Sequence, residues 1–206
     1  MAHRDRETEI KLAVENAAAA RRLLRRAGFR VSSRRAFEAN TVFDTAAGEL
    51  RARSSLLRVR ESGGKMTTTY KGPPEAGPHK SREELETEVA SARALTAIFD
   101  RLGFRPVFRY EKYRAEYRRP GSSGVATVDE TPIGTYVELE GNPRWIDRTA
   151  KELGFPRERY ITASYGALYL EWCRERNLKP GNMVFGKEVK TQQSEVRGGT
   201  APRHLR

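Results

Sequence analysis

Charged side chains alternate with apolar or small side chains along several short segments, and this period of two is typical of β-strands. Residues 7–12 read Glu-Thr-Glu-Ile-Lys-Leu, with charge at every second position. The same alternation recurs in residues 57–60, 82–89, 112–117 and 136–140. Turn signals at Gly63-Gly64, at residues 120–124 and at Thr131-Pro132 predict hairpins between neighbouring segments, and therefore antiparallel strands.

Three helices are predicted from signals at both of their ends. Asn16, Ser91 and Asn142 are N-cap residues for helices over residues 17–27, 92–102 and 143–153. Each predicted helix stops at a Gly-Phe pair, where glycine permits the left-handed conformation that ends a helix. A fourth helix is predicted over residues 164–176. Because a strand with alternating carboxylates precedes each of the first three, we interpret strand, helix and Gly-Phe as a duplication inside one domain.

The charged side of these strands has two interpretations. In an ordinary antiparallel sheet it faces water, and helices cover the apolar side. In a closed barrel of about eight strands the charged sides converge on an interior with room for a small ligand. The order of charges favours the barrel, because basic residues group on some strands and paired carboxylates on others. Holding a metal ion against a chain of phosphates requires such a mixture.

The charge balance predicts an anionic partner. The chain of 206 residues has 39 Lys and Arg against 27 Asp and Glu, a net charge of +12, which suits a nucleotide, a polyphosphate or a nucleic acid. Residues 181–206 show no sustained period and few apolar residues, so we expect a domain over residues 1–180 followed by a basic, disordered tail. That tail holds five basic and two acidic residues, so most of the excess charge belongs to the domain.

Composition also limits the cellular setting. No apolar stretch approaches the ~20 residues of a membrane span, and the first residues are charged rather than typical of a signal peptide. The single cysteine, Cys173, makes no internal disulfide, suits a reducing compartment and is expected to be apolar filler in a helix. We therefore expect a cytoplasmic protein without a membrane partner. Nothing in the sequence indicates the oligomeric state.

Eight short segments occur in the order found in the CYTH superfamily, also called triphosphate tunnel metalloenzymes. They are residues 7–11 (Glu-x-Glu-x-Lys), 42–45 (Val-Phe-Asp-Thr), 56–60 (Leu-x-Arg-x-Arg), 69–71 (Thr-Tyr-Lys), 82–86 (Arg-x-Glu-x-Glu), 112–114 (Lys-x-Arg), Asp129 with 138–140 (Glu-x-Glu), and 164–165 (Ser-Tyr). The chain resembles this superfamily, which includes class IV adenylyl cyclases, thiamine triphosphatases and inorganic triphosphatases, over about residues 5 to 172.

The resemblance implies an α+β fold: an eight-stranded antiparallel closed β-barrel, open as a tunnel, with helices on its outside. It implies a bound triphosphate and a divalent cofactor, Mg²⁺ or Mn²⁺. The implied substrate-binding residues are Lys11, Arg58, Arg60, Lys71, Arg82, Lys112 and Arg114, and the implied metal ligands are Glu7, Glu9, Asp129, Glu138 and Glu140. We assign catalytic roles to Lys71, Glu138 and Glu140, and we expect residues 43–56 and 72–80 at the mouth.

Three functions follow from this set of residues. The first is a metal-dependent phosphohydrolase that acts on inorganic tripolyphosphate or a nucleoside triphosphate. Its attacking water is activated by a second metal ion or by a desolvated lysine near other cations, and the sequence leaves both open. The second is a class IV adenylyl cyclase that converts ATP to cyclic AMP and pyrophosphate. The third is a basic polyanion- or RNA-binding module without catalysis; since the charges point to the tunnel, we expect no nucleic-acid partner beyond weak binding by the tail.

Overall fold

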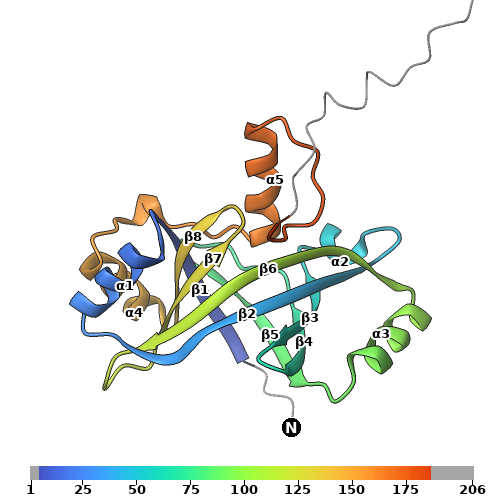
Figure 1. Cartoon of the computed structure of the whole chain (residues 1–206), viewed down its shortest axis with the longest axis horizontal. Helices are drawn as coiled ribbons and strands as arrows, with labels where there is room; N and C mark the ends of the chain where they lie inside the picture. Colours follow the sequence, from blue (N-terminus) through green and yellow to red (C-terminus); the bar gives the residue numbers. More distant parts are fainter. Residues whose placement is uncertain (1–4, 187–206) are drawn as a thin grey trace, which may run out of the picture.

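The computed structural model describes residues 5–186, which form a closed barrel of eight antiparallel strands with helices on its outside (Figure 1). The strands are β1 (Asp5–Val14), β2 (Arg30–Thr45), β3 (Leu56–Ser62), β4 (Lys65–Lys71), β5 (Lys80–Glu88), β6 (Phe104–Arg118), β7 (Val125–Thr131) and β8 (Gly134–Glu140). Their order is β1-β5-β4-β3-β2-β6-β7-β8, and β8 pairs back onto β1. The predicted fold class is therefore confirmed.

The strands β1–β4 and β5–β8 are related by an internal symmetry. If each strand of the first set is exchanged with its counterpart in the second (β1 with β5, β2 with β6 and so on), the ring has the same order of neighbours. This internal symmetry agrees with the first two of the three predicted repeats, because α1 (Ala17–Arg26) and α3 (Ala92–Arg101) occupy equivalent places after β1 and β5. The third does not fit it, since a helix follows β8 but none follows the equivalent β4. In this ring β1 and β2 are four strands apart in either direction. They therefore belong to opposite walls of the barrel.

The helices begin and end within one residue of the predicted limits. In addition to α1 and α3 they are α4 (Pro143–Glu152) and α5 (Tyr165–Glu175); the short α2 (Glu49–Ala52) and a 3₁₀ turn, η1 (Arg157–Arg159), were not predicted. The side chains of Asn16, Ser91 and Asn142 each accept a hydrogen bond from a first-turn N–H, at 2.9, 3.2 and 3.0 Å. None of the described helices has the length and apolar character that crossing a bilayer requires.

The apolar sides of the strands face outward, toward the helices. Ile10 and Leu12 of β1 pack with Leu24 of α1 and with Trp145 and Ile146 of α4, and all five are buried. Because alternate residues of a strand point to opposite faces, the charged residues between Ile10, Leu12 and their neighbours face the barrel interior. Hydrophobic burial outside the barrel thus orients the polar side chains inside it.

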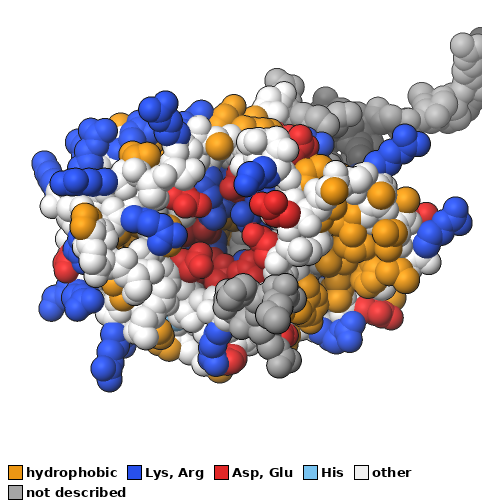
Figure 2. Space-filling view, turned by 90° about the horizontal axis from the view of Figure 1, so that it is seen from below, with side chains coloured by type: hydrophobic (Ala, Val, Ile, Leu, Met, Phe, Trp, Pro, Cys, Tyr) orange, Lys and Arg blue, Asp and Glu red, His pale blue; other side chains and the backbone are white. Residues whose placement is uncertain are grey.

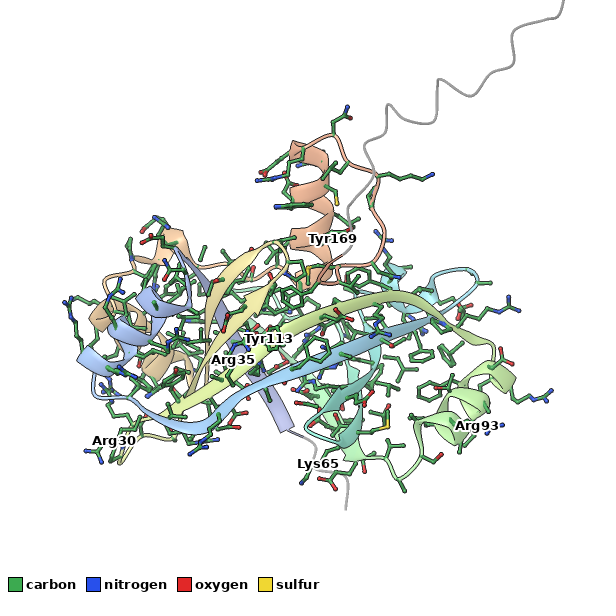
Figure 3. All side chains as sticks on the ribbon, viewed as in Figure 1. Arg30, Arg35, Lys65, Arg93, Tyr113 and Tyr169 are labelled. Atoms are coloured by element: carbon green, nitrogen blue, oxygen red, sulfur yellow. The ribbon has the colours of Figure 1, made fainter. Side chains whose placement is uncertain are left out.

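Helix α5 packs across one end of the barrel through a tyrosine-rich cluster that also contains Cys173, which is buried as expected (Figure 3). Met183 belongs to the same cluster, and its backbone pairs with Arg109 and Glu111 of β6 at 3.0 and 2.9 Å. The chain therefore packs on the barrel beyond the predicted domain limit at residue 180. Residues 187–206, the rest of the predicted tail, lie outside the described residues.

Strand β2 was not predicted as a strand, although it is 16 residues long. Residues 30–35 are exposed on both faces, because this half of β2 extends past the barrel with only β6 beside it. Without a buried face it shows no alternation of polar and apolar residues. There the guanidinium carbon of Arg35 lies 3.5 Å from the centroid of the Tyr113 ring, and Arg35 donates to Glu130 at 2.8 Å (Figure 3).

The contact between α4 and Gly124, the residue before β7, predicts the effect of one added methyl group. A Cβ at Gly124 would lie 2.4 Å from the ring of Trp145. We expect Gly124→Ala to lower the free energy of unfolding by about 1–3 kcal/mol, because the ring must move in a packed core. Urea unfolding measures the change. Gly181→Ala is the control, since nothing lies within 4 Å of its Cβ, and equal stability of both variants would contradict the placement of Trp145.

Candidate functional site

The barrel interior brings the predicted site residues together. One cavity of about 1780 Å³ is lined by Glu7, Glu9, Lys11, Arg58, Arg60, Lys71, Arg82, Lys112, Arg114, Glu138 and Glu140. It opens on the face away from α5, where Figure 2 shows acidic and basic side chains gathered in and around a hollow. Asp129 is the one predicted site residue that does not line the cavity. The interpretation of the charged strand faces as a water-exposed sheet is therefore wrong.

Lys71 lies between two carboxylates on the wall that contains β1 and β5. Its Nζ contacts Glu7 at 2.6 Å and Glu84 at 3.1 Å. Arg82 of β5 also contacts Glu7, at 3.5 Å. Glu84, whose role the sequence left open, is thus a partner of Lys71, and this wall pairs each of these cations with an acid.

Glu9 lies between two lysines of the same wall. Its Oε1 accepts hydrogen bonds from Lys11 and Lys80, each at 3.0 Å. Burial acts to raise the pKa of Glu9, but the two lysines hold it well below the ordinary value. Burial disfavours the charged form of a lysine and so lowers its pKa. Together with repulsion from Lys11 and Arg82, burial lowers the pKa of Lys80 to about 8, although Glu9 acts to raise it. Lys80 therefore holds its proton less firmly than an ordinary lysine.

Asp129 orients cations from behind the cavity lining. Its carboxylate accepts from Lys112 at 2.7 Å, from Arg114 at 2.7 and 2.6 Å, and from the hydroxyl of Tyr165 at 2.8 Å. Although burial acts to raise it, these cations keep the pKa of Asp129 well below the ordinary value. Four hydrogen bonds leave Asp129 no free direction toward a metal ion in this arrangement. Glu138 is engaged in a similar way, by ion pairs with Arg114 and Lys11.

The opposite wall, around β2 and β3, has fewer carboxylates. Arg58 donates to the hydroxyls of Tyr110 and Thr69 at 3.3 and 3.0 Å, and Arg60 donates to Asn40 at 3.2 Å. Burial and the neighbouring Arg58 lower the pKa of Arg60. For Tyr110 burial acts to raise the pKa, but Arg58 and other nearby cations lower it. Both shifts indicate an excess of positive charge at this wall.

Glu140 lies in a part of the tunnel where negative charge is in excess. Within residues 5–186 its carboxylate has no hydrogen bond or ion pair, and the residue is exposed in the cavity lining beside Glu9, its cross-strand neighbour. Loss of water around the carboxylate, together with repulsion from Glu7 and Glu9, raises its pKa to about 7 in spite of Lys71. This part of the tunnel therefore carries more negative charge than its own cations neutralise.

The negative excess fits a divalent cation. Mg²⁺ binds through one or two protein carboxylates and completes its coordination with water and phosphate oxygens. Glu140, whose carboxylate has no cation partner, suits this role. Glu7, which repels Glu140, would join it as a ligand in exchange for its contact with Lys71. In the part of the chain that the structure describes, no group of three or more acidic, histidine or cysteine side chains could hold the ion alone. Phosphate and water oxygens would have to supply the remaining ligands.

Sequence reasoning missed three residues that shape the site. Lys80 was assigned to a mouth loop, yet it begins β5 and shares a face with Arg82, so the alternation could have identified it. Glu38 is buried 3.6 Å from Lys112, but the unpredicted β2 hid its orientation. Asp44 accepts three hydrogen bonds from backbone N–H groups at and before α2, at 2.8 to 3.0 Å.

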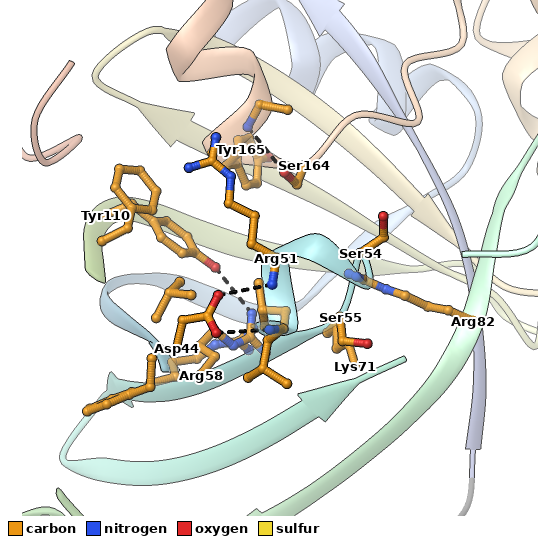
Figure 4. Close-up of a pocket in the computed structure, with 18 of the residues that line it drawn as sticks. Asp44, Arg51, Ser54, Ser55, Arg58, Lys71, Arg82, Tyr110, Ser164 and Tyr165 are labelled. Carbon is orange, nitrogen blue, oxygen red and sulfur yellow. Dashed lines mark hydrogen bonds between the residues drawn. The ribbon is translucent and has the colours of Figure 1, made fainter. Parts of the chain in front are cut away.

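The end of the cavity near α5 is built from α2 and the start of α5. Asp44 fixes the α2 loop there, and Arg51 of that helix extends toward Ser164 and Tyr165 (Figure 4). Residues 43–56, which were predicted at the mouth, line the cavity at this end, with the exception of Glu49 and Arg53. Among residues 72–80, by contrast, only Pro74 and Lys80 line it.

Comparisons with known proteins agree with this geometry. The family described as CYTH domain matches residues 5–165. "Putative adenylate cyclase MJ0240" of Methanocaldococcus jannaschii is 29% identical over 148 residues, which cover 71% of this chain and 83% of that protein. The structure of PH1819 from Pyrococcus horikoshii superposes with a TM-score of 0.67 and 24% identity over 80% of this chain and 98% of the other.

A further solved structure carries a functional statement of its own. The "putative adenylyl cyclase" HpAC1 from Hippeastrum, for which a dominant triphosphatase activity is stated, has a TM-score of 0.59 and 26% identity. The match covers 84% of this chain and 98% of that one. The likeness therefore extends over nearly the whole of the related protein.

The shifted pKa of Glu140 predicts a pH-dependent gain in stability for Glu140→Gln. In the wild type this carboxyl has a pKa of about 7 when folded against 4.5 as its ordinary value, so its contribution to stability falls as the pH rises from 4.5 to 7. With EDTA present, we expect the variant to be more stable at pH 8 by about 1 kcal/mol. The full pKa shift corresponds to a larger gain in stability, but Glu140 is exposed and water screens the repulsion from its neighbours.

Urea unfolding at two pH values measures this difference. At pH 4 both side chains are uncharged, so the gain should disappear. Equal stability of the variant and the wild type at pH 8 would show that the carboxylates around Glu140 do not repel it.

Proposed function

Since the chain belongs to the CYTH domain family, we propose that it is a divalent-metal-dependent phosphohydrolase that cleaves the terminal phosphate from a triphosphate bound in the barrel. The substrate is inorganic tripolyphosphate or a nucleoside triphosphate. The observation that carries the proposal is the division of charge inside the cavity of the closed barrel. Cations with few acidic partners line the β2–β3 wall, and a carboxylate without a cation partner lies at the β1–β8 wall.

A triphosphate requires both kinds of wall. Its several negative charges need lysine and arginine donors, and planar guanidinium groups bind phosphate oxygens in pairs. Arg58, Arg60 and Lys112 supply these donors around one part of the cavity. A bound Mg²⁺ or Mn²⁺ would draw electron density from the phosphate oxygens and neutralise their charge. Glu140 and Glu7 would hold that ion, and the repulsion between the two carboxylates supports this assignment.

In the hydrolytic step, the oxygen of a water molecule forms a bond to the terminal phosphorus, and the bond from that phosphorus to the bridging oxygen breaks. The leaving diphosphate keeps the electron pair, which the cations of the tunnel stabilise. We assign the water proton to the Nζ of Lys80, whose pKa of about 8 leaves part of it neutral near pH 8. Lys71, held between Glu7 and Glu84, serves as a fixed cation.

The adenylyl cyclase remains a specific alternative, because M. jannaschii MJ0240 is named as one. In that reaction the ribose 3′-oxygen attacks the α-phosphorus and pyrophosphate leaves. The phosphatase is favoured here by the name given to the Hippeastrum structure, in which triphosphatase activity dominates. Both reactions use the same tunnel, so only the products separate them.

The first test measures metal-dependent release of phosphate. We expect the wild type to release orthophosphate from tripolyphosphate or ATP with Mg²⁺ or Mn²⁺ and to lose the activity in EDTA. Glu140→Gln should require roughly 10- to 100-fold more metal for half-maximal rate, the usual effect of disturbing a metal site. Glu15→Gln, the same change on the exposed outside of the barrel, should leave the rate unchanged.

The outcome also separates the enzyme from a non-catalytic polyanion-binding module. Such a module would bind RNA with an affinity that falls steeply with salt. Glu140→Gln, which removes a negative charge, would leave that affinity unchanged or improve it. A folded protein that releases phosphate from neither substrate with either metal would overturn the proposed hydrolase.

Phosphorus NMR of a reaction with ATP distinguishes the phosphatase from the cyclase. We expect signals of ADP and orthophosphate, because attack occurs at the terminal phosphorus. Cyclic AMP together with pyrophosphate would assign the attack to the α-phosphorus and replace the proposal with the cyclase. The unreacted ATP signal in a sample with EDTA serves as the control.

A further inference from the structure

Buried polar atoms without hydrogen-bond partners gather on one wall of the tunnel. Six such side-chain atoms occur within residues 5–186, and four of them belong to β2, β3 and β4. They are Oε2 of Glu38, Nδ2 of Asn40, Nε of Arg58 and Oγ1 of Thr67. Three of these four are hydrogen-bond donors. An unpaired buried polar group lowers stability by about 1–3 kcal/mol. Because these groups gather at one place, we expect a ligand to bind there and supply their partners.

Strand register places Asn40, Arg60 and Thr67 in one row. Asn40 is directly opposite Arg60 across β2–β3, and Arg60 is directly opposite Thr67 across β3–β4. The Nε of Arg60 donates to Oδ1 of Asn40 at 3.2 Å, which fixes the orientation of the amide and leaves Nδ2 as the free donor. Asn40 is fully buried, while Arg60 and Thr67 line the cavity.

The charge around this row calls for an anion. Three cations surround it. Lys112 is paired with Asp129 at 2.7 Å and lies 3.6 Å from Glu38, whereas Arg58 and Arg60 have carboxylates only at 3.6 Å (Glu86) and 3.8 Å (Glu38). Burial acts to raise the pKa of Glu38, but these cations lower it to about 2, so this carboxylate stays ionised. Neither arginine has a carboxylate within hydrogen-bond distance, so the guanidinium groups of Arg58 and Arg60 remain available to an anion.

We propose that Asn40, Arg58, Arg60 and Thr67 form a subsite for one terminal phosphate group of the triphosphate. This inference rests on the proposed function and adds two residues, Asn40 and Thr67, that no sequence motif assigned. A terminal phosphate has three non-bridging oxygens, which can accept from an amide, a hydroxyl and guanidinium groups together. Neutral donors at fixed positions add directional contacts that lysines alone do not provide.

The test compares two identical substitutions. Thr67→Val and Thr149→Val each remove a buried hydroxyl without a partner, but Thr149 lies in α4, outside the barrel. Neither variant should lose stability, because the deleted group makes no hydrogen bond within the protein. Isothermal titration calorimetry with tripolyphosphate should show roughly tenfold weaker binding for Thr67→Val, the loss of a hydrogen bond to a charged group. Binding by Thr149→Val should equal that of the wild type.

A second variant tests the charge of the subsite. Asn40→Asp has the shape of asparagine and gains an ion pair with Arg60, so it should fold. It places a negative charge against the phosphate, and we expect tripolyphosphate affinity to fall by more than the tenfold loss of Thr67→Val. Thermal unfolding without ligand, which the subsite does not affect, checks that both proteins are folded.

The possible results separate this inference from the proposed function. If the wild type binds tripolyphosphate and Thr67→Val and Asn40→Asp bind equally well, the row holds only ordered water and the subsite is wrong. If the wild type binds and the variants bind weakly, but no phosphate is released, the subsite stands and the hydrolase does not. A wild type that binds neither tripolyphosphate nor ATP overturns both.

Discussion

The pairing of buried charges is the interaction on which the rest of this structure depends. Removing an isolated carboxylate or ammonium group from water is far more costly than a single contact can offset. The interior of this barrel nevertheless encloses acids and bases from all eight strands, and most of them are joined at 2.6 to 3.2 Å. Each cation therefore reduces the cost of burying its neighbouring carboxylate. Losing one partner would leave the other buried and unpaired.

The outer hydrophobic layer is the counterpart of this charged interior. Ile10, Leu12 and Leu24 exclude water between the barrel and its helices, and in doing so they fix which side of each strand faces inward. A slip of one residue in β1 would turn Glu9 and Lys11 toward the helices and Ile10 into the tunnel. The register is therefore set by two penalties that act together: apolar groups in the tunnel and unpaired charges in the core.

The departures from complete pairing indicate where a ligand belongs. Glu140 has an excess of negative charge around it, and the row that contains Asn40 has unpaired donors and an excess of positive charge. The two lie on opposite walls, because β8, which carries Glu140, and β3, at the centre of the row, are four strands apart in the ring of eight. A triphosphate with its metal ion would supply both missing partners, with phosphate oxygens toward the donors and the cation toward Glu140. The tunnel thus contains charged groups and hydrogen-bond donors whose partners the protein itself does not supply.

The sequence by itself determined the local structure and the inward direction of most charges. Caps at Asn16, Ser91 and Asn142 act within one turn, and a period of two separates the two faces of a strand such as β1, so both are visible in a single chain. Only the tertiary structure decided which charges meet. Asp129 became a buried partner of Lys112 and Arg114, Lys80 became a tunnel lysine, and Asn40 and Thr67 came into one row. These outcomes depend on the pairing of strands far apart in the sequence, which local patterns do not encode.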